Sequence, residues 1–302
     1  GEPWNDFAED FYTTDVFIDY AKEFVGEALE TAPEKPFFLY IAHNAPHYPL
    51  HVLEEDYRKY ENRYEEGWDL IRERRYKKQL KMGLIPEEWA LSSRPKHVPA
   101  WEDLGEEEKQ WDERRMAAFA GMVDRVDQST GRLVDFLKEN DVFENTLILI
   151  CSDNGACPFD RTKREDLEPW DPISYWCYDT GWSHVGNTPF RLHKQNQHEG
   201  GSASPLIAHW PAGIEAETGS ISDQPGHLID FMATCVELGG ASYPDMHTLA
   251  DGTEIEVEPL QGKSLAPFLR GEEREPHEFL YFYFGDNRAI RKGKWKLVTH
   301  RA

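Results

Sequence analysis

Three short apolar runs constrain the fold of this chain more than any other feature. They occupy residues 37–42, 146–151 and 205–210. A continuous apolar run of this length is typical of a strand that is buried on both faces of a sheet. A helical pattern at residues 116–137 separates the first two runs, and another at residues 228–238 follows the third. This alternation predicts an α/β fold in which helices flank a mostly parallel sheet.

The C-terminal end has a different pattern. Tight turns at Gly285-Asp286 and Lys292-Gly293 separate short apolar stretches. They predict a small antiparallel sheet with strands at residues 279–284, 288–291 and 294–298. We therefore expect a large α/β domain over residues 1–270 and the start of a small antiparallel subdomain in residues 271–302. Within the large domain, charged residues dominate positions 54–115, which indicates a surface insert.

The charge balance narrows the expected partners. The chain has 33 Lys and Arg residues against 56 Asp and Glu residues, a formal net charge of −23. Proteins that bind nucleic acid or anionic lipid normally present a basic surface, so neither is an expected partner. A run of 18 apolar residues is also absent, and we expect no membrane span. An anionic small substrate is compatible with this balance, and no feature of the sequence specifies an oligomeric state.

The four cysteines do not form a metal-binding pattern. Cys151, Cys157, Cys177 and Cys235 lack the CxxC spacing of zinc-ribbon and thioredoxin-like motifs. We expect free, buried thiols, and a single disulfide is the alternative.

Polar clusters adjoin the predicted strands. His43–His47 follows the first apolar run, Asp153-Asn154 follows the second, and Lys194 lies in a polar segment that leads into the third. Ligands of open α/β sheets bind at the carboxyl ends of the strands, so these clusters hold the candidate functional residues.

Asp153 and Asn154 allow two interpretations. Asp and Asn-Gly sequences favour turns, so the pair and Gly155 can be purely structural. Alternatively, the two side-chain oxygens face one hard cation. Carboxylate and amide oxygens suit Ca²⁺ or Mg²⁺ better than Zn²⁺, which prefers nitrogen and sulfur ligands.

His47 and Lys194 are the candidates for binding an anion. His47 lies in a proline-rich loop that can aim its imidazole at the strand ends, where it would bind an anion or protonate a leaving group. His43 is a lesser candidate, as a partner behind His47. Lys194 precedes Glu199-Gly200-Gly201, whose paired glycines permit close backbone approach. A lysine beside such a turn can serve as a point charge for an oxyanion. Without these roles, both residues are ordinary loop residues.

Many of these segments match one known pattern in order and spacing. They are residues 36–40, 45–50, 122–127, 145–148, 152–155, 187–191, 194 with 198–201, 205–213, 227–230 and 294–297. Together they resemble the sulfatase family of the alkaline-phosphatase-like superfamily. The resemblance implies the alkaline-phosphatase-like fold, with a mostly parallel sheet, flanking helices and a small C-terminal antiparallel subdomain.

The resemblance also implies a role for each candidate residue. Asp153 and Asn154 would be two ligands of a calcium ion, which would act as a template and Lewis acid for the sulfate. His47 would contact the sulfate and the leaving-group oxygen. Lys194 would bind the sulfate and neutralise the charge that develops as the S–O bond breaks, with His198 as a further substrate-binding candidate. The implied activity is hydrolysis of an aryl or carbohydrate sulfate ester, and the implied location is periplasmic or secreted.

The nucleophile motif of that family is absent from the 302 residues. Sulfatases carry Cys-x-Pro-x-Arg or Ser-x-Pro-x-Arg, whose first residue is oxidised to formylglycine. The segment Cys157-Pro158-Phe159-Asp160-Arg161 begins with Cys and ends with Arg, but its proline is at the wrong step. We therefore expect the formylglycine and further metal ligands to lie upstream of Gly1. The chain would then be an N-terminally truncated sulfatase with an incomplete calcium site and no activity alone.

Two other functions fit the same residues. One is a phosphonate or phosphodiester hydrolase of the same superfamily, although its two-zinc members have an Asp-His pair where this chain has Asp153-Asn154. The other is a non-catalytic paralogue that binds sulfated glycans, which the net charge of −23 disfavours. In each case, aromatic residues of the loop at 156–190 either pack in the core or stack on a substrate ring.

Overall fold

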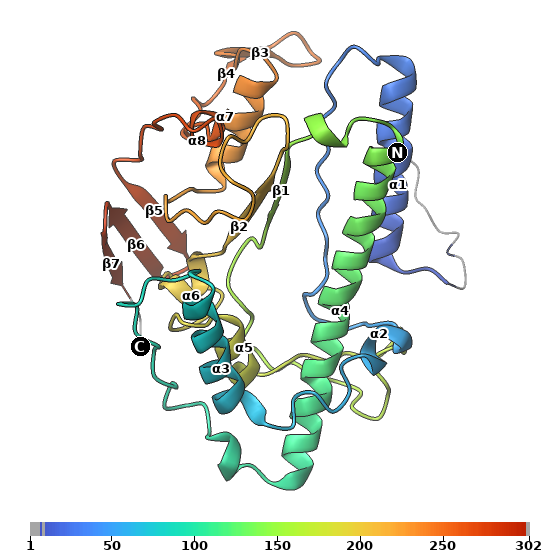
Figure 1. The fold of residues 1–302 in the computed structure, drawn as a ribbon, viewed down its shortest axis with the longest axis vertical. Coiled ribbons are helices and arrows are strands. Elements are labelled where there is room, and N and C mark those ends of the chain that lie inside the picture. The colour runs from blue at the N-terminus through green and yellow to red at the C-terminus, as the bar shows by residue number, and fades with distance from the viewer. Residues whose placement is uncertain (1–6, 8–9, 300–302) are drawn as a thin grey trace. The chain divides into compact units, whose positions relative to one another are not determined.

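The computed structural model describes residue 7 and residues 10–299. The truncation that we expect before Gly1 lies outside the described residues. Within them the chain forms two compact units, and Figure 1 shows their elements. Unit 1 takes the described residues up to Phe143 together with Gly155–Lys194 and His198–Ala203. Unit 2 takes Glu144–Asn154, Gln195–Gln197 and the described residues from Ser204 onward. The predicted boundary at residue 270, between a large α/β domain and a small antiparallel subdomain, stays a prediction.

Unit 1 is built from helices. Its longest helix, α4, covers Glu106–Glu139 and confirms the helix that the apolar pattern at 116–137 predicts. The helix begins earlier than that pattern because Glu108 accepts a hydrogen bond from the Gly105 N–H at 2.9 Å and so caps the first turn. The other helices are α1 (Thr13–Thr31), α2 (Glu54–Arg58), α3 (Gly67–Lys81), η1 (Trp101–Asp103), α5 (Thr180–Gly186) and α6 (Glu199–Ser202).

Tryptophan side chains form the centre of the unit 1 core. Trp68, Trp101 and Trp182 meet edge to face, with ring centroids 4.7, 5.8 and 5.8 Å apart. Such pairs stabilise a core by about 0.5–1.5 kcal/mol each beyond the area that they bury. Gly67 allows this packing, because a Cβ there would lie 2.0 Å from the Trp101 ring. Two of these tryptophans come from residues 54–115, so this charge-rich stretch also supplies core.

The loop at 156–190 supplies the rest of this core. Trp176, Tyr178 and Trp182 are buried in it, at 0%, 6% and 0% exposure. For these three residues the structure therefore favours packing over stacking on a ligand.

Unit 2 contains the strands, and they pair antiparallel. β1 (Ile148–Cys151) and β2 (Leu206–His209) form where the second and third apolar runs predict strands. Ile148 lies opposite His209, and no parallel pair occurs within residues 10–299. The prediction of a mostly parallel sheet is therefore wrong for this part of the chain. The predicted burial on both faces is also not observed, since Ile150 and Ile207 are 43% and 62% exposed. Apolar composition does not encode the direction of the partner strand.

The first apolar run does not form a strand. Residues 37–42 have no regular secondary structure, and Phe38 and Tyr40 are 74% and 79% exposed. An extended segment becomes a strand only through hydrogen bonds to a neighbouring strand. None of the strands in the described part of the chain pairs with this segment.

The C-terminal antiparallel sheet is confirmed. β5 (Leu280–Phe284), β6 (Asn287–Lys292) and β7 (Trp295–Thr299) lie in the order β5-β6-β7. Gly285 and Gly293 have φ values of 57° and 53°, which two-residue hairpin turns require. The second turn lies one residue later than predicted, at residues 293–294. The remaining elements are η2 (Phe143–Asn145), α7 (Ile229–Leu238), β3 (Met246–Thr248), β4 (Glu254–Glu256) and α8 (Ala266–Leu269).

All four cysteines are free thiols. Cys177 is buried as predicted, but Cys151 is exposed and the other two are half-buried, so the expectation of buried thiols holds only for Cys177. Among the described helices, none combines the length and apolar character that crossing a bilayer requires.

Candidate functional site

His47 and Lys194 are in contact in unit 1, although they lie 147 residues apart in the chain. Lys194 Nζ is 3.1 Å from His47 Nε2. His47 Nδ1 is 2.7 Å from the carbonyl oxygen of Tyr48. A carbonyl only accepts, so Nδ1 carries the proton and Nε2 presents its lone pair to the ammonium group. The fold therefore brings together the two residues that the sequence predicts to bind an anion.

Asn187 holds the segment that carries Lys194. Its Oδ1 accepts from the Ala156 N–H at 2.9 Å, and its Nδ2 donates to the Leu192 carbonyl at 3.0 Å. The Lys194 N–H donates to the Ala156 carbonyl at 3.0 Å. These bonds keep Leu192 at φ 65°, a left-handed conformation that residues other than glycine rarely adopt. Sequence reasoning gave Asn187 no role, although it belongs to one of the family-like segments.

Gly200 packs closely against the segment that carries Lys194. Its N–H donates to the Arg191 carbonyl at 3.1 Å. A Cβ on Gly200 would lie 2.2 Å from the Leu192 carbonyl oxygen, which no side chain tolerates. The predicted close backbone approach at these glycines is therefore confirmed for Gly200, and the neighbour is the Lys194 segment.

Arg72 of α3 anchors the start of that segment. The residue is 4% exposed, and none of the described carboxylates pairs with it. Burial, together with the charge of Arg75, lowers the pKa of Arg72 to about 10. Its sequence neighbourhood is rich in solvated arginines, so no local signal marks it as buried. Its guanidinium donates instead to oxygen atoms of His184, Thr188, Ser92, Pro189 and Phe190.

Two buried histidines lie behind the Lys194 segment. Ser183 Oγ is 2.5 Å from His193 Nδ1. Burial is the main cause that lowers the pKa of His193 to about 4 and that of His184 to about 3, and the charge of Arg72 adds to both shifts. Both imidazoles are 2–3% exposed and neutral near pH 7, so they support the segment and do not reach a substrate.

The other two histidine candidates are not part of the His47–Lys194 pair. His43 packs against Phe17 of α1, with ring centroids 6.1 Å apart, and burial lowers its pKa. No hydrogen bond joins His43 to His47 in the described structure. His198 precedes α6, and its carbonyl accepts from the N–H groups of Gly201 and Ser202. A substrate-binding role for His198 stays a prediction.

Asp153 and Asn154 lie in unit 2, directly after β1. Asp153 is exposed, Asn154 is half-buried, and Ser152 Oγ donates to the Asn154 carbonyl at 2.8 Å. Their oxygen atoms have the chemistry that calcium prefers. No group of three or more His, Cys, Asp or Glu residues that could hold a metal occurs among the residues described. The pair therefore fits part of a hard-cation site, and its role as calcium ligands stays a prediction.

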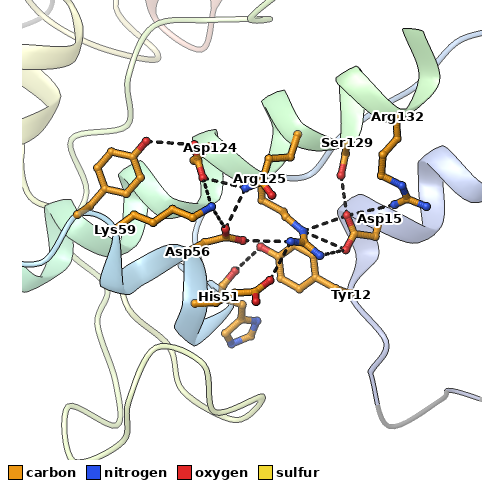
Figure 2. A network of polar contacts seen from close by, with 12 residues as sticks. Tyr12, Asp15, His51, Asp56, Lys59, Asp124, Arg125, Ser129 and Arg132 are labelled. Carbon is orange, nitrogen blue, oxygen red and sulfur yellow. Dashed lines mark hydrogen bonds and ion pairs between the residues drawn. The ribbon is translucent and has the colours of Figure 1, made fainter. Parts of the chain in front are cut away.

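A network of charged side chains supports the far end of the His47 loop, as Figure 2 shows. The Tyr12 hydroxyl donates to the His51 carbonyl at 2.8 Å. Beside Tyr12, Asp15 of α1 accepts from Arg125 of α4 at 3.0 Å and from Ser129 at 2.6 Å. The network therefore ties α1 and α4 to the chain just beyond His47.

Comparison with known proteins places the chain among sulfatases. The family model described as Sulfatase matches residues 2–241. An uncharacterized sulfatase of Schizosaccharomyces pombe is 29% identical, over 96% of this chain and 54% of that protein. An arylsulfatase of Klebsiella aerogenes is 26% identical, over 87% of this chain and 60% of that protein. The chain thus spans only 54% and 60% of the lengths of these relatives.

Solved structures share the fold. The crystal structure of Ps i-CgsB in complex with k-i-k-neocarrahexaose matches with a TM-score of 0.58 and 24% identity, over 97% of this chain and 47% of that one. The phosphonate monoester hydrolase of Agrobacterium radiobacter matches with a TM-score of 0.55 and 18% identity, over 97% of this chain and 53% of that one. The likeness establishes a fold that sulfatases and phosphonate hydrolases share.

Proposed function

Because the chain belongs to the sulfatase family, we propose that the complete protein hydrolyses sulfate esters and that His47 and Lys194 bind the sulfate group. The observation that carries this proposal is the 3.1 Å contact between Lys194 Nζ and His47 Nε2. It places an ammonium group and an imidazole, from distant parts of the chain, at one exposed point of unit 1. The ammonium group is a charge-assisted N–H donor of the kind that suits sulfate oxygens.

Lys194 would act on the charge that develops during the reaction. Cleavage of the S–O bond leaves negative charge on the bridging oxygen, and a positioned cation stabilises this charge. The leaving alcohol also needs a proton. His47 would supply it from Nε2 after taking one from water, while Lys194 keeps its charge and the Nδ1–H of His47 stays bound to the Tyr48 carbonyl.

The proposed reaction also uses calcium and formylglycine. Asp153 and Asn154 would hold the calcium through their side-chain oxygens. When bound, the ion supplies Lewis acidity and orients the sulfate, and formylglycine supplies the nucleophile. The 302 residues contain no Cys-x-Pro-x-Arg or Ser-x-Pro-x-Arg, so we expect this chain to be inactive by itself. The similar proteins include an arylsulfatase and one crystallised with a neocarrahexaose, which supports an aryl or carbohydrate sulfate as substrate. A periplasmic or secreted location stays a prediction.

Turnover of 4-nitrophenyl sulfate by the complete protein tests this function. We expect Lys194→Ala to lower kcat/KM by about 10²–10³-fold and His47→Gln by about 10²–10⁴-fold. Lys109→Ala is the matched control, because this lysine pairs with Glu106 on the surface of α4 and should leave turnover unchanged.

Three results would overturn the proposal in different ways. Full activity of Lys194→Ala would remove the residue from the site. Faster turnover of a phosphonate monoester than of the sulfate ester would favour the phosphonate hydrolase. Binding of sulfated glycans by the complete protein without any turnover would favour the non-catalytic paralogue.

A further inference from the structure

A surface that combines aromatic rings and cations adjoins His47 in unit 1. We call Tyr48, Arg161, Lys163 and Tyr175 the basic aromatic patch. The Tyr48 ring lies 4.4 Å from the His47 ring and 6.0 Å from the Tyr175 ring. Arg161 Nη1 donates to the Tyr48 hydroxyl at 3.0 Å, and its guanidinium lies 5.8 Å from that ring. Lys163 Nζ lies 5.7 Å from the Tyr175 ring. The patch is thus a continuous surface that begins at the candidate site.

Backbone hydrogen bonds fix the position of the patch. Lys163 and Tyr175 exchange both main-chain hydrogen bonds, at 2.8 and 3.2 Å, as an isolated antiparallel bridge. Past Tyr48, the Leu50 N–H donates to the Trp176 carbonyl at 2.9 Å. The two segments that carry the patch are therefore joined to each other, which fixes the backbone of the patch next to the His47 loop.

The cations of the patch lack acidic partners in a strongly acidic chain. No described carboxylate oxygen lies within ion-pair distance of Arg161 or Lys163. The next cation along the chain, Arg164, pairs with Asp166 at 3.0 Å. With a net charge of −23, the chain has many carboxylates that could pair with these groups. These two cations belong to the patch that adjoins His47, and without carboxylate partners they create a local positive potential there, which attracts anions.

Tyr175 is an aromatic residue of the 156–190 loop that a ligand can reach. Trp176, Tyr178 and Trp182 are buried in the core. Tyr175 is half-buried and lies at the surface next to Tyr48, which is also half-buried. An aromatic ring with one open face is suited to packing against a sugar ring, whose anionic substituents can then reach the flanking cations.

We propose that the substrate carries a second anionic group, a sulfate or a carboxylate, that binds Arg161 and Lys163 while the sulfate to be cleaved binds His47 and Lys194. This inference rests on the proposed function and names its substrate class. The His47 and Tyr48 rings are 4.4 Å apart, and the Arg161 guanidinium lies 5.8 Å from the Tyr48 ring. One sugar residue or two linked residues can therefore reach from His47 to Arg161. The substrate is then a carbohydrate with at least two anionic groups, not a monosulfated aryl alcohol.

Binding of two closely related sugars to the 302-residue chain tests this inference. The probes are N-acetylglucosamine 6-sulfate and glucosamine 2-N,6-O-disulfate, which differ only in the acetyl or sulfo group on the 2-nitrogen. Isothermal titration calorimetry at low ionic strength should show that the disulfate binds about 10-fold more tightly, because an added charge-assisted contact is worth roughly that factor.

Variants of the patch then locate the second anion. The double variant Arg161→Gln, Lys163→Gln should bind both sugars with similar affinity and should keep the wild-type affinity for the monosulfate. Arg164→Gln is the matched control, because it removes a neighbouring charge that is paired with Asp166. It should keep the preference for the disulfate. Both altered side chains of the double variant are exposed, so we expect it to fold normally.

The outcomes separate this inference from the proposed function. If the two sugars bind the wild-type chain equally and Lys194→Ala weakens both, the sulfate site stands and the second anion site is wrong. If Lys194→Ala leaves both affinities unchanged, the proposed function fails and the inference fails with it. If neither sugar binds, the second anion site is wrong, and turnover of 4-nitrophenyl sulfate by the complete protein still decides the proposed function. If Arg164→Gln abolishes the preference as fully as the double variant does, the preference reflects overall charge and the assignment to Arg161 and Lys163 is wrong.

Discussion

Both units contain a cluster built around carboxylates, and the two clusters are organised differently. In unit 2, Asp230 of α7 is fully buried. It accepts from Arg274 Nη2 at 2.6 Å and from His277 Nε2 at 2.7 Å. The backbone N–H groups of His227 and Lys263 donate to it at 2.8 and 2.9 Å. One carboxylate thus connects the start of α7 to three other parts of unit 2.

In unit 1, the network of Figure 2 spreads its charge over several residues. Arg125 pairs with Asp15 and also lies 3.5 Å from Asp56. Lys59 binds Asp56 at 2.7 Å and Asp124 at 2.8 Å. With Glu55 at 3.1 Å, Arg125 therefore has three carboxylate partners. Lys59 has two, and Asp56 has two cations.

This difference indicates which charged side chains can be replaced without a large loss of stability. Removal of one partner from a buried, closed pair leaves an uncompensated charge, and the loss is large. In the network of unit 1, most charged groups keep another partner of opposite charge after a single substitution. Water also screens the charges that are half-exposed. We therefore expect the two clusters to respond unequally to single substitutions.

The largest expected effect is that of Asp230→Ala. It leaves Arg274, whose side chain is 2% exposed, as a buried cation without its carboxylate. We expect the free energy of unfolding to fall by about 3–5 kcal/mol. Urea unfolding, combined with hydrogen exchange of the α7 amides, measures this. The double variant Asp230→Leu, Arg274→Met removes both charges and should recover much of the loss. A change below about 1 kcal/mol for Asp230→Ala would contradict a closed pair.

Arg125→Met should have a smaller effect, about 2 kcal/mol, because hydrogen bonds to charged groups contribute roughly 1.5–3 kcal/mol. Lys59 still neutralises Asp56, and Arg132 remains 3.5 Å from Asp15. Urea unfolding again measures the change. Arg58→Met is the control, since the ion pairs of this arginine of α2 are with surface glutamates and their loss should change the free energy of unfolding much less. An effect as large as that of Asp230→Ala would contradict the idea of a shared network.

Acid should remove the contribution of both clusters. Burial raises the pKa of Asp15, but hydrogen bonds from Arg125 and Ser129 outweigh it, so the pKa lies below its usual value. For Asp230, burial also raises the pKa, and hydrogen bonds from the Lys263 N–H and from His277 outweigh it. A lowered folded-state pKa means that the stabilisation is complete above the unfolded-state pKa and is lost as the pH falls through the folded value.

Asp15→Asn measures this loss in unit 1. The difference in unfolding free energy between wild type and variant should be constant from pH 7 to 5 and should shrink below about pH 4, where the unfolded carboxyl binds a proton. Urea midpoints at several pH values give the curve. A difference that stays constant down to pH 2 would show that the charge of Asp15 does not stabilise unit 1.

Local patterns account for the parts of the fold that could be predicted. α4 and the β5-β6-β7 sheet follow from apolar spacing and from turn glycines, which are properties of neighbouring residues. The partner of residues 37–42 and the direction of the β1–β2 pair depend on distant segments. A run of apolar side chains carries no information on either.

The same distinction applies to the candidate site. His47 and Lys194 could be named from the family-like segments, but their contact is a product of the fold. Arg72 could not be named, because a buried arginine in a charged stretch has the same sequence pattern as a solvated one. Arg125 and Asp230 belong to family-like segments that had no assigned role. In this structure Arg125 joins α4 to α1, and Asp230 joins α7 to the non-helical segments around Lys263 and Arg274.

The smallest expected change in stability, about 1 kcal/mol, is that of Tyr12→Phe, which removes one hydrogen bond to the His51 carbonyl. Burial raises the pKa of Tyr12 to about 12, so the hydroxyl keeps its proton and remains a donor at neutral pH. This bond links the network to the His47 loop, and hydrogen exchange of the amides at residues 47–51 should therefore accelerate. Tyr243→Phe, at an exposed position of unit 2, is the control. Unchanged exchange in the loop would show that the network holds the helices of unit 1 but does not position His47.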